Sequence, residues 1–316
     1  MRAAILDDYQ NVALSLADWS AIAGDVEIVV FNRPFASEDE AIAALQGFAI
    51  IVGMRERTPF PRRVIEALPD LKLLITTGAR NNSFDLKAAA ERGVTVCGTS
   101  TVGAPTAGIV FGLILELTRH IGFENARLKA GETWQVTIGQ DLEGLTLGIV
   151  GLGKLGRHVA AIAQAFGMSV IAWSRNLTPE AAAAAGAEAV SKEELFRRSD
   201  IVTIHYVLSE RSRGLITGAD LNLMKPTALL INTARAPIVD QAALLKVLED
   251  KRIAGAGLDV FETEPLPRDH PYRKLDNVVL TPHLGYVSEQ NYRVYFRDAV
   301  DDIRAFLNGK PVRVLA

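Results

Sequence analysis

Residues 146–166 read TLGIVGLGKLGRHVAAIAQAF. An apolar run with strand composition comes first, and a segment with apolar side chains at helical spacing comes last. Between them lies the pattern Gly-x-Gly-x-x-Gly, formed by Gly151, Gly153 and Gly156. After a strand, such glycines allow a tight turn, close approach of a pyrophosphate and close packing of the next helix, whose N-terminus offers free N–H groups to phosphates. The stretch predicts a parallel α/β fold with a dinucleotide site; the alternative is a purely structural glycine turn.

Short apolar runs alternate with helical segments on both sides of this stretch. We expect strands within 3–8, 26–31, 48–53, 71–77 and 94–97 before it, and within 169–173, 200–207, 228–234, 252–260 and 277–283 after it. One long helical stretch is expected over 105–131 and a last helix over 288–307. Because strand–helix alternation is typical of a parallel sheet covered on both faces, the sequence predicts two doubly wound α/β domains with a cleft between them.

Composition narrows the class of protein. Apolar residues make up 49% and charged residues 22%, with a net charge of −3, which argues against disorder. No block of like charges suggests binding to nucleic acid or to an anionic membrane. The one cysteine, Cys97, indicates a small buried side chain and a reducing compartment. We therefore expect a cytoplasmic protein without a membrane span, a nucleic-acid partner or a metal ion.

The strand after the glycine motif decides which dinucleotide is expected. Residues 168–178 read MSVIAWSRNLT, with no acid at the strand end, where a carboxylate would hold the adenosine ribose hydroxyls of NAD. Ser174, Arg175 and Asn176 stand there instead. Serine can donate to a 2′-phosphate oxygen, and arginine can pair with the phosphate. The segment favours NADP(H), with NAD(H) possible; the alternative is a relaxed preference, if Arg175 stacks on the adenine or points into solvent.

Three further side chains follow strands, where ligands of parallel sheets bind. Arg235 ends LLINTAR, and its guanidinium could bind a substrate carboxylate in a bidentate fork or pair with Asp240. Glu264, in LDVFETEPLP, could orient a histidine or could be a solvated acid. His283 follows NVVLTP and could transfer a proton or be structural.

The motifs GLGKLG, INTARAPIVD, GAGLDVFETEP and NVVLTPHLG occur in this order. With them the chain closely resembles the D-isomer-specific 2-hydroxyacid dehydrogenases over essentially its whole length. The resemblance implies a flavodoxin-like substrate domain, 1–99 plus 286–316, and a Rossmann domain, 100–285. It also implies an NAD(P)-dependent enzyme that forms a homodimer through the nucleotide-binding domain.

The resemblance assigns roles to the candidates. Arg235 would bind the substrate carboxylate, His283 would exchange the proton with the substrate oxygen, and Glu264 would support the histidine. Asp259 would contact the nicotinamide carboxamide. The expected cofactor-binding residues are Gly151, Gly153, Lys154, Leu155, Gly156, Ser174, Arg175, Asn176, Thr233, Asp259, His283 and Gly285. The expected substrate-binding residues are Arg55, Arg57, Gly78, Ala79, Arg235 and Tyr286.

Several departures from the family pattern leave the substrate open. Arg80 stands in TTGARNNSFD, where the family often has a glycine-rich loop, and Tyr286 replaces a common second glycine. In GMRERT, Arg55 and Arg57 would point to the same side of an extended chain, so that Arg55 could bind a second anionic group; solvated arginines beside Glu56 are the alternative.

We expect a reductase of small 2-oxo acids such as glyoxylate, hydroxypyruvate or a phosphorylated analogue. The alternatives are a 3-phosphoglycerate-type dehydrogenase using NAD, oxidation of an inorganic or one-carbon anion, and a non-catalytic NAD(H)-sensing protein.

Overall fold

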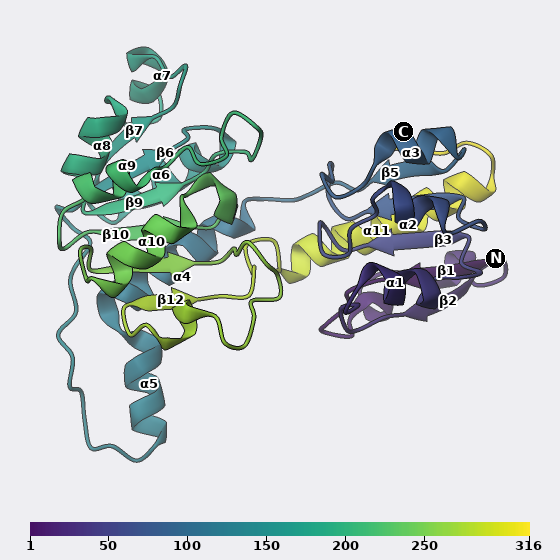
Figure 1. The fold of residues 1–316 in the computed structure, drawn as a ribbon, viewed down its shortest axis with the longest axis horizontal. Helices are drawn as coiled ribbons and strands as arrows, with labels where there is room; N and C mark the ends of the chain where they lie inside the picture. Colours follow the sequence, from purple (N-terminus) through teal and green to yellow (C-terminus); the bar gives the residue numbers. More distant parts are fainter. The chain divides into compact units, whose positions relative to one another are not determined.

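A computed structural model describes residues 1–316 and divides the chain into two compact units. The first unit consists of Met1–Gly103 and Ser288–Ala316, and the second of Ala104–Val287. The domain boundaries expected from the sequence, after residues 99 and 285, lie close to these. Each unit is a parallel sheet covered by helices, as the strand–helix alternation predicted (Figure 1).

The first unit is a five-stranded parallel sheet in the order β2-β1-β3-β4-β5. Its strands are β1 (Arg2–Ile5), β2 (Glu27–Val30), β3 (Ile50–Gly53), β4 (Leu73–Thr76) and β5 (Thr95–Gly98). Its helices are η1 (Ala13–Ser15), η2 (Trp19–Ile22), α1 (Glu38–Ala44), α2 (Arg62–Glu66), α3 (Leu86–Glu91) and α11 (Glu289–Leu307). The strands β3 and β4 are fully buried, which explains why they read as unbroken apolar runs rather than as alternating ones.

The C-terminal residues close the outer side of this sheet. Val314 forms an antiparallel bridge with Cys97 of β5, and Nε of Arg313 donates to the buried carboxylate of Asp302 on α11 at 3.0 Å. Cys97 is buried, as its apolar surroundings in the sequence predicted, and burial raises the pKa of its thiol to about 12. The thiol is therefore protonated at neutral pH.

The second unit is a seven-stranded parallel sheet in the order β12-β11-β10-β9-β6-β7-β8. Its strands are β6 (Thr146–Val150), β7 (Ser169–Trp173), β8 (Glu188–Ala189), β9 (Ile201–Ile204), β10 (Leu229–Asn232), β11 (Gly255–Leu258) and β12 (Val278–Leu280). Its helices are α4 (Pro105–Arg119), α5 (Ile121–Lys129), α6 (Lys154–Ala165), α7 (Pro179–Ala183), α8 (Lys192–Arg198), α9 (Gly218–Leu223), η3 (Ala236–Ile238), α10 (Gln241–Glu249) and η4 (Pro271–Lys274).

The strand order places a topological switch point at β6. β6 has β7 on one side and β9 on the other. The strands that follow β6 are therefore added first on one side of it and then on the other. Ligands of open α/β sheets bind outside the carboxyl ends of strands at such a point. A ligand of this unit is therefore expected at the loops that follow β6, β7 and β9.

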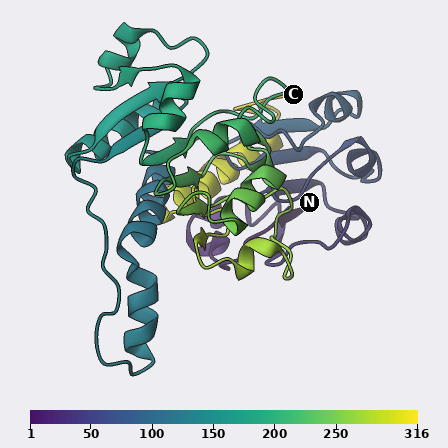
Figure 2. The ribbon, with the colours of Figure 1, turned by 60° about the vertical axis from the view of Figure 1, so that its left-hand side comes forward.

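The helical stretch expected over 105–131 forms two helices, α4 and α5. His120 adopts a left-handed conformation, with φ at 53°, and separates α4 from α5. Glu116 stabilises the break, because its carboxylate accepts a hydrogen bond from the backbone N–H of Gly122 at 2.7 Å. Helix α5 buries no side chain and, with the loop that follows, extends away from the rest of its unit (Figure 2).

No single helix of the chain has the length and apolar character needed to cross a membrane. Helices α4 and α5 reach that length and character only when they are taken together, across a bend of 65°.

Candidate functional site

The turn after β6 has the geometry that the glycine motif predicted. Gly151 has φ at 102°, a conformation that side-chain-bearing residues rarely adopt. A Cβ on Gly156 would overlap the carbonyl oxygen of Gly151, so the first turn of α6 must have glycine there. A Cβ on Gly153 would meet nothing within 4 Å, and no side chain caps the first N–H groups of α6, at Lys154 and Leu155. Open space beside uncapped N–H groups fits a pyrophosphate.

A hollow of about 400 Å³ lies beside this turn, at the switch point of the sheet. It is lined by Gly151, Gly153, Ser174, Arg175, Asn176, His205, Tyr206, Val207, Ser209, Arg211, Ser212 and Leu215. None of these side chains is a carboxylate, whereas two are guanidinium groups. The structure thus brings together the glycine turn and the three residues at the end of β7 that the sequence analysis assigned to the cofactor.

Ser174 is tied to the glycine turn. Its hydroxyl oxygen accepts a hydrogen bond from the backbone N–H of Leu152 at 3.0 Å, which leaves the hydroxyl proton available to a ligand. Arg175 and Asn176 are exposed, and the Arg175 side chain forms no ion pair within the chain. Arg211 also lines the hollow and is exposed, but the sequence analysis did not single it out. It lies in the loop after β9, far from Arg175 in sequence, and no motif marks it.

His205 follows β9 and lines the same hollow. Its Nε2 lies 3.0 Å from the hydroxyl oxygen of Thr203, and its Nδ1 is buried without a hydrogen-bond partner. Desolvation lowers the pKa of His205 to about 4, so its ring is neutral at neutral pH. The two arginines therefore carry the positive charge of the hollow.

The other end of the same sheet edge holds the remaining candidates, because β10, β11 and β12 are neighbouring parallel strands. After β10, the side chain of Asn232 accepts from the backbone N–H of Ala234 at 3.0 Å and donates to the carbonyl of Arg235 at 3.2 Å. This loop holds Arg235, which is half-buried and donates from Nη1 to the carbonyl of Ala234 at 2.7 Å. Thr233 is buried, and its hydroxyl has no hydrogen-bond partner within the chain. Asp240, the alternative partner of Arg235, caps α10.

Glu264 and His283 are brought together by the loops that follow β11 and β12. Nδ1 of His283 lies 2.6 Å from Oε2 of Glu264, and the two side chains are only 15% and 21% exposed. The other oxygen, Oε1, accepts from the backbone N–H of Phe261 at 2.9 Å. Because a carboxylate only accepts hydrogen bonds, the shared proton lies on Nδ1. The ring of Tyr286 meets that of His283 edge-on, with ring centroids 5.5 Å apart.

Asp259, which the resemblance implied would contact the nicotinamide carboxamide, holds the chain around His283 in this structure. Its side chain is fully buried, and burial raises the pKa of its carboxyl group. Its oxygens accept from the hydroxyl of Thr281 at 2.6 Å and from the backbone N–H groups of Leu284 and Gly285 at 2.7 and 2.8 Å. These bonds fix the chain on both sides of His283, which is left-handed with φ at 53°.

The first unit holds the other substrate-binding candidates, and the geometry of Arg55 and Arg57 differs from expectation. Residues 55 and 56 form a turn with Arg55 left-handed at φ 52°, so the argument from equal parity along an extended chain is wrong. Arg55 is half-buried, and its Nη1 donates to the carbonyl of Thr77 at 3.2 Å. A Cβ on Gly78 would overlap its guanidinium. Arg55 thus packs directly on Gly78, next to Ala79, rather than extending into solvent.

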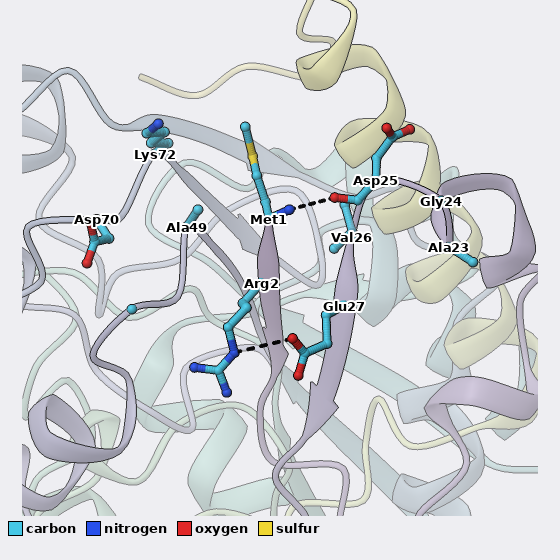
Figure 3. A pocket seen from close by; sticks show the side chains of 11 residues that line it. Met1, Arg2, Ala23, Gly24, Asp25, Val26, Glu27, Ala49, Asp70 and Lys72 are labelled. Atoms are coloured by element: carbon cyan, nitrogen blue, oxygen red, sulfur yellow. Dashed lines mark hydrogen bonds and ion pairs between the residues drawn. The ribbon is translucent and has the colours of Figure 1, made fainter.

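A second hollow, of about 750 Å³, opens at the amino-terminal end of the first sheet (Figure 3). Three of its charged groups, the N-terminal amine, Arg2 and Glu27, have partners within the chain. The N-terminal amine donates to the carbonyl of Asp25 at 2.6 Å, and Nε of Arg2 lies 3.8 Å from a carboxylate oxygen of Glu27. Since parallel sheets bind ligands at the opposite edge, this hollow lacks the features of a reaction site.

Comparison with known proteins identifies the class. Residues 111–285 match the family described as "D-isomer specific 2-hydroxyacid dehydrogenase, NAD binding domain". A hydroxypyruvate reductase from Blautia hydrogenotrophica is 29% identical over 324 residues, covering 100% of this chain and 99% of that protein. A glyoxylate reductase from Thermococcus litoralis is 37% identical over 259 residues, covering 79% of this chain and 78% of that protein. The crystal structure of a phosphoglycerate oxidoreductase from Vibrio cholerae superposes with a TM-score of 0.93 at 36% identity, covering 98% and 99% of the two chains.

The chain belongs to the D-isomer-specific 2-hydroxyacid dehydrogenase family. It is an NAD(P)-dependent oxidoreductase of 2-hydroxy acids, and its two doubly wound sheets are the fold of that family. The resemblance that the four motifs suggested is thereby confirmed.

Proposed function

We propose that the protein is an NADP(H)-dependent reductase of small 2-oxo acids. The observation that carries the choice of cofactor is the hollow at the switch point, which contains Arg175 and no carboxylate. An acid at the end of β7 would accept from both ribose hydroxyls and would repel a 2′-phosphate. Ser174 occupies that place with a hydroxyl proton free to donate. Hydrogen bonding and charge therefore both favour the phosphorylated cofactor.

The second unit supplies the proposed catalytic residues. The bound nicotinamide provides the hydride of the reduction. Arg235 binds the substrate carboxylate through its guanidinium fork and polarises the neighbouring carbonyl. His283 donates a proton from Nε2 to the oxygen that becomes the hydroxyl, and Glu264 holds the ring through Nδ1. The support for this assignment is the short, largely buried contact between Glu264 and His283 beside the loop that carries Arg235.

The substrate is proposed to be glyoxylate, hydroxypyruvate or an analogue with a second anionic group. Glyoxylate and hydroxypyruvate reductases are among the relatives reported above, as is a phosphoglycerate oxidoreductase. In the first unit, Arg55 is held by Thr77 and packs on Gly78. A guanidinium placed in this way at a strand end favours an acidic or phosphorylated substrate over a neutral one. Oxidation of 3-phosphoglycerate with NAD is the alternative that this arginine also supports.

One experiment tests the cofactor and the substrate together. Initial rates with glyoxylate, hydroxypyruvate, phosphohydroxypyruvate and pyruvate are measured with NADPH and with NADH on the unmodified protein. We expect a higher kcat/KM with NADPH for each 2-oxo acid that is reduced. A higher kcat/KM with NADH would refute the cofactor proposal, and turnover confined to phosphohydroxypyruvate would favour the 3-phosphoglycerate alternative.

We also propose that the protein forms a homodimer through the second unit and works in the cytoplasm. Helix α5 and the loop after it expose a set of large apolar side chains that would be costly to leave in water. They are Ile121, Phe123, Leu128, Trp134, Val136 and Ile138, between 50% and 96% exposed. Light scattering after size exclusion should give twice the monomer mass of 34.2 kDa, and the monomer mass would contradict the dimer.

The proposal of a cytoplasmic location is supported by Cys97. Its buried, protonated thiol suits a reducing compartment.

A further inference from the structure

We propose that Arg211, in the loop after β9, is a second phosphate-binding arginine that contacts the 2′-phosphate of the cofactor together with Arg175. This inference rests on the proposed NADP(H) preference and adds a specificity-determining residue to it. Both arginines line the same hollow of about 400 Å³. They come from loops that follow β9 and β7, the two strands that flank β6 at the switch point.

The two arginine-bearing loops are tied to each other. The hydroxyl of Tyr206, in the β9 loop, accepts a hydrogen bond from the backbone N–H of Arg175 at 3.0 Å. The ring of Tyr206 also stacks on that of Trp173 at the end of β7, with centroids 6.1 Å apart and planes inclined by 23°. This link fixes the separation of the two loops before any ligand binds.

The turn that presents Arg211 is organised by the neighbouring serine. The hydroxyl of Ser212 is buried, accepts from the backbone N–H of Ser209 at 2.8 Å and donates to the carbonyl of Val207 at 2.7 Å. The backbone of Gly214 is anchored in turn to the carbonyl of Pro237 at 2.8 Å. A turn closed by buried bonds loses little entropy when its exposed arginine contacts a ligand.

The charge of the hollow points to an anion. Two arginines line it, no acidic residue does, and neither arginine forms an ion pair within the chain. Glu210, which precedes Arg211, lies outside the lining. Two cations in one hollow repel each other, and binding of a multiply charged anion offsets that repulsion. A phosphate monoester has the charge and the acceptor oxygens for two arginines at once, which a ribose hydroxyl lacks.

The matched control is Arg213, which is exposed on the same turn but does not line the hollow. We compare the full-length wild type with Arg211→Ala, Arg211→Lys and Arg213→Ala, measuring by calorimetry the affinity for adenosine 2′,5′-bisphosphate and for 5′-AMP. Arg211→Ala should weaken binding of the bisphosphate about tenfold, the lower range for a charge-assisted contact in an open site. Its affinity for 5′-AMP should not change. Arg211→Lys should fall between Arg211→Ala and the wild type, because it keeps the charge and loses the fork. Arg213→Ala should match the wild type.

The outcomes separate the two proposals. If the wild type prefers the bisphosphate and Arg211→Ala binds it as tightly as Arg213→Ala does, the role of Arg211 is wrong while the NADP(H) preference stands. Equal weakening of 5′-AMP and the bisphosphate by Arg211→Ala would also overturn it, because the arginine would then act elsewhere than on the 2′-phosphate. If the wild type binds both nucleotides equally and uses NADH better than NADPH, both proposals fail.

Discussion

Replacing Glu264 by Gln changes one atom and tests the assignment of His283. Both carboxylate oxygens of Glu264 face N–H groups, one from His283 at 2.6 Å and one from the backbone of Phe261 at 2.9 Å. A glutamine has a single oxygen, and its amino group can only donate. It can therefore satisfy only one of the two neighbours.

Each orientation of the glutamine lowers turnover. If the oxygen stays on Phe261, the amino group donates to Nδ1 of His283, and the ring proton is confined to Nε2, where the ring can no longer accept a proton. If the oxygen faces His283, the partly buried N–H of Phe261 meets a donor. Losing a charge-assisted hydrogen bond costs about 1.5–3 kcal/mol, which corresponds to about a ten- to hundredfold loss in kcat. KM should change less, because Arg235 still binds the substrate.

The assay is the steady-state rate in both directions, with cofactor deuterated at the transferred position to show that hydride transfer limits the rate. Glu262→Gln is the control, since Glu262 is exposed two residues away and changes the net charge equally. If Glu264→Gln matched Glu262→Gln in a step limited by hydride transfer, the pairing of Glu264 with His283 would have no catalytic role.

Three further changes have defined outcomes. Arg235→Lys should reduce kcat/KM for the 2-oxo acid at least about tenfold, because an ammonium cannot form the bidentate contact, and initial rates would show it; an unchanged kcat/KM would contradict the role of Arg235. The double variant Ser174→Asp, Arg175→Ala should move the ratio of kcat/KM values toward NADH by about tenfold, since unit charges about 4 Å apart interact by ~1 kcal/mol in water and more in a partly desolvated site; an unmoved ratio would place these side chains away from the 2′-phosphate. Burial raises the pKa of Asp302 to about 7, so its protonated form is favoured in the folded protein, and its contribution to stability falls as pH rises from about 4 to 7. Urea unfolding should show that the free energy of unfolding of the wild type falls relative to that of Asp302→Asn between about pH 4 and 7. A difference that stays constant with pH would contradict the raised pKa of Asp302.

Most of the fold could be predicted because buried parallel strands leave a strong signal. Residues 48–53 have no polar interruption, residues 71–77 have only Lys72 before their apolar centre, and both runs contain a fully buried strand. β8 was not predicted, since Glu188–Ala189 is two residues long and has no apolar run. The start of a second helix directly after His120 was not predicted, because it depends on a side-chain contact from Glu116 to the backbone of Gly122.

The site was predictable where motif and topology coincide. Glu264 and His283 follow neighbouring strands, and the structure brings them into contact. Arg211 could not be found in this way, because an arginine in an exposed loop has no signature until the strand order places that loop beside the end of β7. The burial of Asp259 could not be predicted from the sequence either, since two of its partners are backbone N–H groups, which every sequence contains.

One end of the sheet edge holds two carboxylates, Asp259 and Glu264, and the other end, at Ser174, holds none. This contrast supports the proposal that position 174 decides between NADP(H) and NAD(H). After β11 and β12, Asp259 and Glu264 are shielded from water, and each is balanced by two or more hydrogen-bond donors, so their charge holds His283 in place without repelling a ligand. A carboxylate at position 174 would accept from the N–H of Leu152 and would otherwise face the open hollow that Arg175 and Arg211 line. Its charge would repel a 2′-phosphate, whereas the proton transfer proposed for His283 would be unaffected.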